Sequence, residues 1–95
     1  LFREGPDSFR VNCTTLPDIF QKHQLETVDL LKLDCEGAEV EILQTVSEEL
    51  LHRIQQIVME IHLPKQMEPI FERLLQSGFK RATYPKKNYA AFYRQ

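Results

Sequence analysis

The chain has 95 residues, of which 42% are hydrophobic and 27% are charged, and its formal net charge is −2 at pH 7. This length allows one small domain, and the composition excludes a disordered or fibrous protein. Lys and Arg are scattered, which makes nucleic acid a poor candidate partner, and no apolar run has the length of a membrane span.

The first residues, LFREGPDSF, contain neither a basic leader nor an apolar signal region, and we expect a cytoplasmic protein with no membrane contact in this segment. Because the chain begins at Leu1 without Met, any signal on an upstream segment would lie outside it. The two cysteines, Cys13 and Cys35, are expected to be reduced thiols. Neither has a partner at zinc-ligand spacing, so no zinc site is expected.

A loop-like start is followed by alternating apolar and polar residues from Phe9 to Thr14, the pattern of a half-exposed strand. Thr15 has the character of a helix N-cap, with Pro17 in the first turn and Asp18 completing a capping box. These signals predict a short helix over Leu16 to His23.

The stretch VDLLKLDCEGA then joins an apolar run, Val28 to Leu33, to consecutive acidic, thiol and glycine positions. Such a run predicts a central strand that is covered on both faces, as in a parallel sheet. From Ala38 the apolar residues recur at helical spacing, and Glu36, Glu39 and Glu41 fall where the helix dipole favours negative charge. Ser47 is expected to cap a further short turn, Glu48 to Arg53.

A second apolar run, Ile54 to Ile61, predicts another strand that Pro64 ends. The distance from Asp34 to this strand allows a helical crossover, so the two strands are expected to be parallel. Asp34, Glu60 and His62 would then emerge at the same edge of the sheet, where open α/β sheets bind ligands.

The last helix is the most strongly patterned, with one apolar face, Pro69 in the expected first turn and Gly78 as the residue that ends it. Lys80 to Tyr84 and Tyr89 to Tyr93 follow as an expected antiparallel hairpin around PKKN. The predicted class is therefore α/β. The expected face of the last helix consists of Met67, Ile70, Phe71, Leu74 and Leu75.

The strings TTLPDIF, VDLLKLDCEGAEVEIL and IVMEIH, followed by a helix ending in SGF, resemble the FkbM family of S-adenosylmethionine-dependent methyltransferases. The resemblance covers Val11 to Phe79. It implies the C-terminal half of a class I, Rossmann-like methyltransferase sheet, with parallel strands, crossover helices and a terminal antiparallel hairpin. The positions that match are Thr15, Leu16, Asp18, Asp34, Glu36, Gly37, Ala38, Glu39, Glu60 and His62.

The chain departs from the family pattern in one respect. Family members carry, upstream of the matching region, a glycine-rich turn and an acidic residue that hold most of the cofactor, whereas the three glycines here include no G-x-G arrangement. Residues 1–95 are therefore expected to form a single partial domain. Alone, this piece would bind S-adenosylmethionine poorly and be inactive.

The resemblance implies O-methylation of a hydroxyl group on a small molecule or sugar. Asp34 and Cys35 would face the cofactor, and Asp34, Glu36, Glu60 and His62 would be catalytic. His62 is the candidate general base because the unperturbed pKa of histidine lies near operating pH. Asp34 would orient the donor or the acceptor, and Glu60 or Glu36 would orient the imidazole or hold the hydroxyl.

Other interpretations stay open. Glu36 and Glu39 could simply be acids that complement the dipole at the start of a helix. His62 could be a surface loop residue, and Cys35 could be a small side chain that fills space between strand and helix. Asp34, Glu36, Glu60 and His62 could instead ligate Mg²⁺ or Mn²⁺ in a metal-dependent hydrolase or a metal-assisted methyltransferase. A third alternative is a noncatalytic interaction fragment that self-associates through the exposed edge of the central strand.

Overall fold

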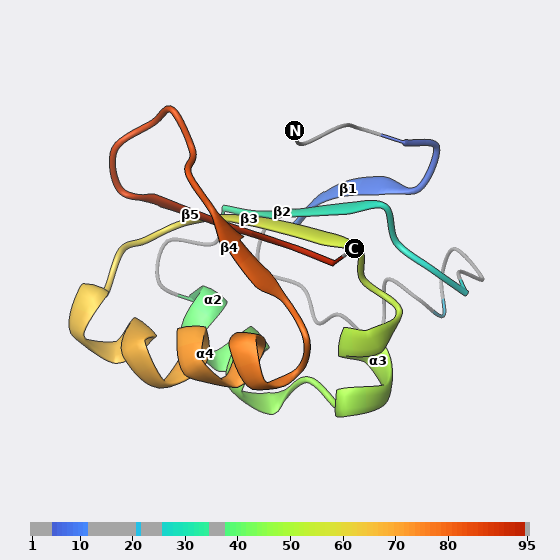
Figure 1. Ribbon diagram of the computed structural model, residues 1–95, viewed down its shortest axis with the longest axis horizontal. Helices are drawn as coiled ribbons and strands as arrows, with labels where there is room; N and C mark the ends of the chain where they lie inside the picture. The colour runs from blue at the N-terminus through green and yellow to red at the C-terminus, as the bar shows by residue number, and fades with distance from the viewer. Residues whose placement is uncertain (1–4, 12–20, 22–25, 35–37, 95) are drawn as a thin grey trace.

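The computed structural model describes residues 5–11, 21, 26–34 and 38–94. The described strands form one sheet in the order β1-β2-β3-β5-β4 (Figure 1). The described elements are β1 (Ser8–Val11), β2 (Leu30–Leu33), α2 (Ala38–Thr45), α3 (Glu48–His52), β3 (Gln56–Glu60), α4 (Pro64–Gln76), β4 (Lys80–Ala82) and β5 (Tyr89–Tyr93).

The first three strands are parallel, and the last two close the sheet as an antiparallel hairpin. The connection from β2 to β3 runs through α2 and α3, and β5 lies between β3 and β4. The predicted α/β class, with parallel strands, a helical crossover and a terminal hairpin, is confirmed. The predicted exposed edge of the central strand is wrong, because β1 pairs with β2 along that edge. Self-association of the chain stays a prediction.

Helices α2, α3 and α4 lie on one face of the sheet (Figure 1). Alternate strand residues face these helices, because successive side chains of a strand point to opposite faces. Leu31 and Leu33 of β2 and Ile57 and Met59 of β3 belong to the helix-side core, whereas Leu30 and Val58 belong to a cluster on the other face. Both faces of the central strands are thus buried, as the apolar run predicts.

The crossover begins with α2 and continues through a capped turn. Ser47 has extended backbone angles, and its hydroxyl accepts a hydrogen bond from the Leu50 backbone N–H at 3.2 Å. This contact satisfies one of the unpaired N–H groups at the start of α3. The predicted cap at Ser47 is confirmed.

Two details of the last helix differ from the prediction. The helix begins at Pro64, so Pro69 lies inside it and not in its first turn. Proline is tolerated at the first helical position because its missing N–H has no helical acceptor there, and this explains the start at Pro64. Leu75, predicted on the buried face, is 50% exposed.

The end of α4 is as predicted. Gly78 has a φ of 99°, a left-handed conformation that glycine adopts without steric cost. The Gly78 N–H donates to the Leu75 carbonyl at 3.2 Å, and the Phe79 N–H donates to the Leu74 carbonyl at 3.0 Å. These two bonds form a Schellman motif, which turns the chain sharply into β4.

Some predicted features lie outside the described residues. They include most of the helix over Leu16 to His23 and its cap at Thr15, of which only Gln21 is described, as helical. Cys13, Cys35, Glu36 and Gly37 are also outside. None of the helices in the described part of the chain is both long and apolar enough to cross a membrane.

Candidate functional site

Asp34 and Glu60 come together because β2 and β3 are parallel neighbours. Leu33 pairs in register with Met59; Asp34 directly follows β2, and Glu60 is the last residue of β3. The carboxyl ends of parallel strands meet at one edge of a sheet, so the two carboxylates are delivered side by side. His62 follows two residues after Glu60, before α4 begins at Pro64.

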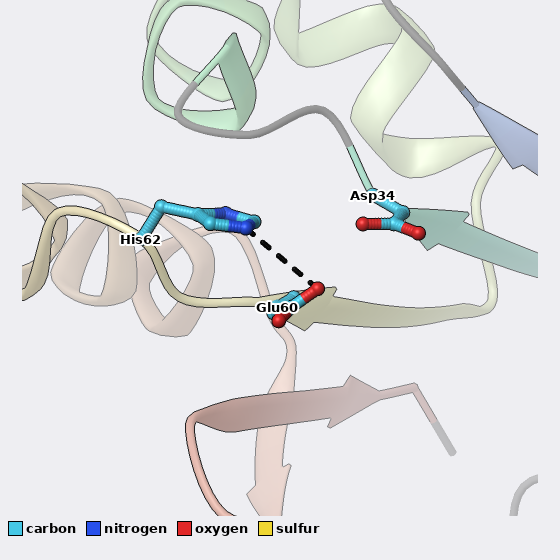
Figure 2. Close-up of side chains that lie close together, drawn as sticks. All are labelled: Asp34, Glu60 and His62. Carbon is cyan, nitrogen blue, oxygen red and sulfur yellow. Dashed lines mark ion pairs between the residues drawn. The ribbon is translucent and has the colours of Figure 1, made fainter.

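Asp34, Glu60 and His62 form a compact cluster at this edge (Figure 2). One ligand atom from each side chain lies within 4.8 Å of those of the other two. The Nε2 atom of His62 is 3.7 Å from Oε2 of Glu60, and these side chains are 27% and 34% exposed. The cluster is therefore open to a small molecule or ion, and its two carboxylates and one imidazole could hold a cation.

Glu39 fixes the imidazole from the other side. Its carboxylate is fully buried, and Oε1 is 2.9 Å from Nδ1 of His62 and accepts the His62 backbone N–H at 3.3 Å. A carboxylate can only accept, so Nδ1 carries the hydrogen in this contact. The other ring nitrogen, Nε2, is left to face the cluster.

The surroundings of His62 raise its pKa above 6.5. The hydrogen bond with Glu39 is the largest cause, and the negative charges of Glu39, Glu60 and Asp34 act in the same direction, whereas partial desolvation opposes them. Each carboxylate favours the protonated imidazole. Near neutral pH this imidazole therefore holds a proton more readily than that of an ordinary histidine.

The structure thus brings together three of the residues predicted from the sequence, Asp34, Glu60 and His62. Glu36 and Cys35 lie outside the described residues, and their roles stay predictions. The contact of Glu39 with His62 is the feature that the sequence analysis missed. Glu39 reads as a helix-start acid by position, and only its place in the string CEGAE, which carries the family resemblance, could have singled it out.

Comparison with known proteins gives a family match. The family described as Methyltransferase FkbM domain matches residues 1–84. A curated relative, "Methyltransferase sdnD" of Sordaria araneosa, is 42% identical over 64 residues, which are 66% of this chain and 25% of the relative. The chain thus spans about a quarter of the length of the curated relative that it matches. No solved structure is significantly similar to it.

Proposed function

The chain belongs to the FkbM methyltransferase family, and from this premise we propose that it supplies the acceptor side of an S-adenosylmethionine-dependent O-methyltransferase. The acceptor is a hydroxyl group on a small molecule or sugar. The chain forms the C-terminal portion of a longer catalytic domain, in keeping with the quarter of the curated relative that it spans. The cofactor is held mainly by the remainder of that domain, so this piece alone is inactive.

The observation that carries the proposal is the convergence of Asp34, Glu60 and His62 at the carboxyl ends of parallel strands. Methyl transfer to oxygen needs a hydroxyl aligned with the sulfonium methyl group and a route for the hydroxyl proton. Alignment supplies much of the acceleration in such reactions. Three polar side chains that are close together and partly exposed provide hydrogen-bond partners for one hydroxyl. Family membership favours this activity over a hydrolase.

The described residues suit one end of the cofactor. The carboxylates of Asp34 and Glu60 would attract the sulfonium cation of the cofactor, because opposite charges attract each other. The described glycines do not lie at this edge, so they do not form the glycine-rich turn expected to hold the rest of the cofactor. Gly78 ends α4, and Gly5 packs against Asp29 at the opposite end of β2. S-adenosylmethionine would supply the methyl group, and Asp34 would orient the reacting end of the donor or the acceptor.

Within the proposal, Glu39 is a positioning residue and the three clustered side chains contact the acceptor. Glu39 holds the His62 ring by Nδ1, so that Nε2 points to the place of the hydroxyl group. The role of His62 as general base stays a prediction, and its raised pKa should shift that role to higher pH than for an ordinary histidine, because only the neutral imidazole accepts a proton.

The proposal is tested on the full-length protein with S-adenosylmethionine and a panel of sugar and small-molecule hydroxyl acceptors, by measuring S-adenosylhomocysteine formation. Replacement of a general base costs about 10²–10⁴-fold in rate, and we expect a loss in that range for His62→Ala. His52→Ala, which changes an exposed histidine on α3, is the matched control and should keep full activity. Methyl transfer to nitrogen or carbon acceptors alone would overturn the O-methylation proposal.

A further inference from the structure

We propose that Asp34, Glu60 and His62 bind a divalent metal ion through two carboxylate oxygens and the Nε2 atom of the imidazole. The distances among these atoms, all within 4.8 Å of one another, allow a single ion between them. The metal site itself does not depend on the proposed methyl transfer. Its use in the reaction does rest on that function.

The three side chains come from positions that the fold holds firmly. Asp34 directly follows β2 and Glu60 ends β3, and the register Leu33↔Met59 of these parallel strands brings the two residues side by side. His62 follows on the short connection to α4. All three are partly exposed, so an ion can reach them without opening the core. Protein metal sites need such preformed ligands, supported by the surrounding structure.

The contact of Glu39 with His62 is a separate observation that favours a metal ligand over a surface histidine. Histidines that bind metals almost always donate their other ring N–H to a carboxylate, a backbone carbonyl or water, which fixes the ring and makes the ligand more basic. Glu39, outside the three ligands and fully buried, makes this contact with Nδ1 at 2.9 Å. The same carboxylate oxygen accepts the His62 backbone N–H. Ring and backbone are thus both held, with Nε2 directed at the two carboxylates.

The charges at this edge also favour a cation. Asp34 and Glu60 bring two carboxylates to the cluster, and the buried carboxylate of Glu39 lies behind the His62 ring. A divalent ion between Asp34 and Glu60 would offset this concentration of negative charge, at a site where partial burial strengthens electrostatic interactions relative to bulk water. The cluster therefore attracts a positive ion more strongly than scattered surface acids do.

The ligand types narrow the choice of ion. Carboxylate oxygens suit Mg²⁺, Ca²⁺ and Mn²⁺, and imidazole suits later first-row metals, so a set of two oxygens and one nitrogen is well matched to Mn²⁺. Three protein ligands leave positions for water or for a substrate oxygen. In the proposed function, the ion would hold the acceptor hydroxyl and lower its pKa as a Lewis acid, so that the hydroxyl proton would pass to solvent water before the oxygen takes the methyl group and S-adenosylhomocysteine leaves. His62 would then be a ligand of the ion in place of the general base.

The test is Mn²⁺ binding to the full-length protein, measured by the loss of the electron paramagnetic resonance signal of free Mn²⁺. We expect saturable binding that His62→Ala, Asp34→Asn and Glu60→Gln each weaken at least tenfold. Glu39→Gln should weaken binding by about 10–100-fold, the usual effect of a residue that supports a metal-bound histidine. Electron spin-echo envelope modulation detects an imidazole nitrogen bound to Mn²⁺, and we expect this modulation in the unaltered protein but not in His62→Ala.

Two variants serve as matched controls, and circular dichroism checks the folding of every variant. His52→Ala removes an exposed histidine beside a carboxylate, and Glu49→Gln neutralises an exposed acid, both on α3. Neither should change the affinity for Mn²⁺. Absence of Mn²⁺ binding, or unchanged binding in folded His62→Ala and Asp34→Asn, would overturn the metal site. Methyl transfer that persists with EDTA, in a protein that binds Mn²⁺ as expected, would support the site and overturn its use in the reaction.

Discussion

Two of the described histidine–glutamate pairs, each joined through Nδ1 of the histidine, differ in almost every respect. Glu48 and His52 lie four residues apart on α3, with side chains 57% and 61% exposed and Nδ1 3.9 Å from the carboxylate. Glu39 and His62 come from α2 and from the end of β3, 23 residues apart in sequence, with side chains 0% and 27% exposed and a separation of 2.9 Å. Residue types alone do not distinguish the two pairs.

The difference shows what tertiary structure adds to a pair of side chains. The Nδ1 atom of His52 is satisfied locally, 2.7 Å from the Glu48 backbone carbonyl, as a helix surface permits at this spacing. His62 is instead held by a carboxylate that the core buries, and its second nitrogen faces two further carboxylates. A local pair contributes to the helix alone, whereas a long-range pair can build a site.

Removal of the buried carboxylate should give the largest effect on stability. Glu39→Ala removes the buried carboxylate that accepts the His62 backbone N–H and contacts Nδ1, and loss of a hydrogen bond to a charged group costs about 1.5–3 kcal/mol. We expect the free energy of unfolding, measured by urea denaturation, to fall by about that amount. Glu39→Gln keeps an oxygen acceptor of similar shape and should lose less. Equal stability of Glu39→Ala and the unaltered chain would show that the contact has no structural weight.

The pH dependence of stability should separate the two pairs further. The folded-state pKa of His62 lies above 6.5, so its contribution is fully present below pH 6.5 and is lost as pH rises through the raised value. In metal-free protein, the difference in unfolding free energy between the unaltered chain and His62→Ala should therefore be largest at mildly acidic pH and should shrink in alkali. Urea titrations with EDTA at several pH values measure it. A difference in unfolding free energy that grows with pH would contradict the raised pKa of His62.

Much of the fold follows from local patterns in the sequence. The apolar run before Asp34, the cap at Ser47 and Gly78 after α4 each depend on neighbouring residues, and each is found as predicted. The start of α4 does not follow in this way, because two prolines, Pro64 and Pro69, both suit a first helical turn. Which proline begins the helix depends on how the chain leaves β3, and packing decides that.

The candidate site is predictable only in part, for a similar reason. The sequence predicts Asp34, Glu60 and His62 as site residues because they follow or end apolar runs, and parallel strands bring their carboxyl ends to one edge of the sheet. Glu39 lies one residue into α2, where its charge already has a local explanation in the helix dipole. Its burial against His62 depends on the angle at which α2 packs under the sheet. No spacing rule along the chain encodes that angle.

Within the exposed pair, Glu48 should matter more than its histidine. Its carboxylate accepts hydrogen bonds from Arg73 at 3.4 Å and from Ser77 at 3.1 Å, so it joins α3 to α4. Exposed ion pairs and hydrogen bonds of this kind contribute about 0.2–1 kcal/mol, and Glu48→Ala should lower the unfolding free energy within that range. Glu49→Ala is the matched control, because the described contact of Glu49 is with Arg53, the C-cap of α3. If Glu49→Ala lost more unfolding free energy than Glu48→Ala, the contacts of Glu48 with α4 would not be what makes it the more important of the two.

His52→Ala should have the smallest effect of all. The side chain is 61% exposed, its contacts lie within one turn of α3, and alanine favours the helix more than histidine does. The lost hydrogen bond to the Glu48 carbonyl and the gain in helix propensity are each a fraction of a kcal/mol, so the unfolding free energy should change by less than about 0.5 kcal/mol. Urea denaturation at the pH values used for His62→Ala gives the comparison directly. If His52→Ala showed the same pH-dependent loss of unfolding free energy as His62→Ala, an exposed carboxylate would stabilise a protonated histidine as well as a buried one does. The burial of Glu39 would then not explain the behaviour of His62.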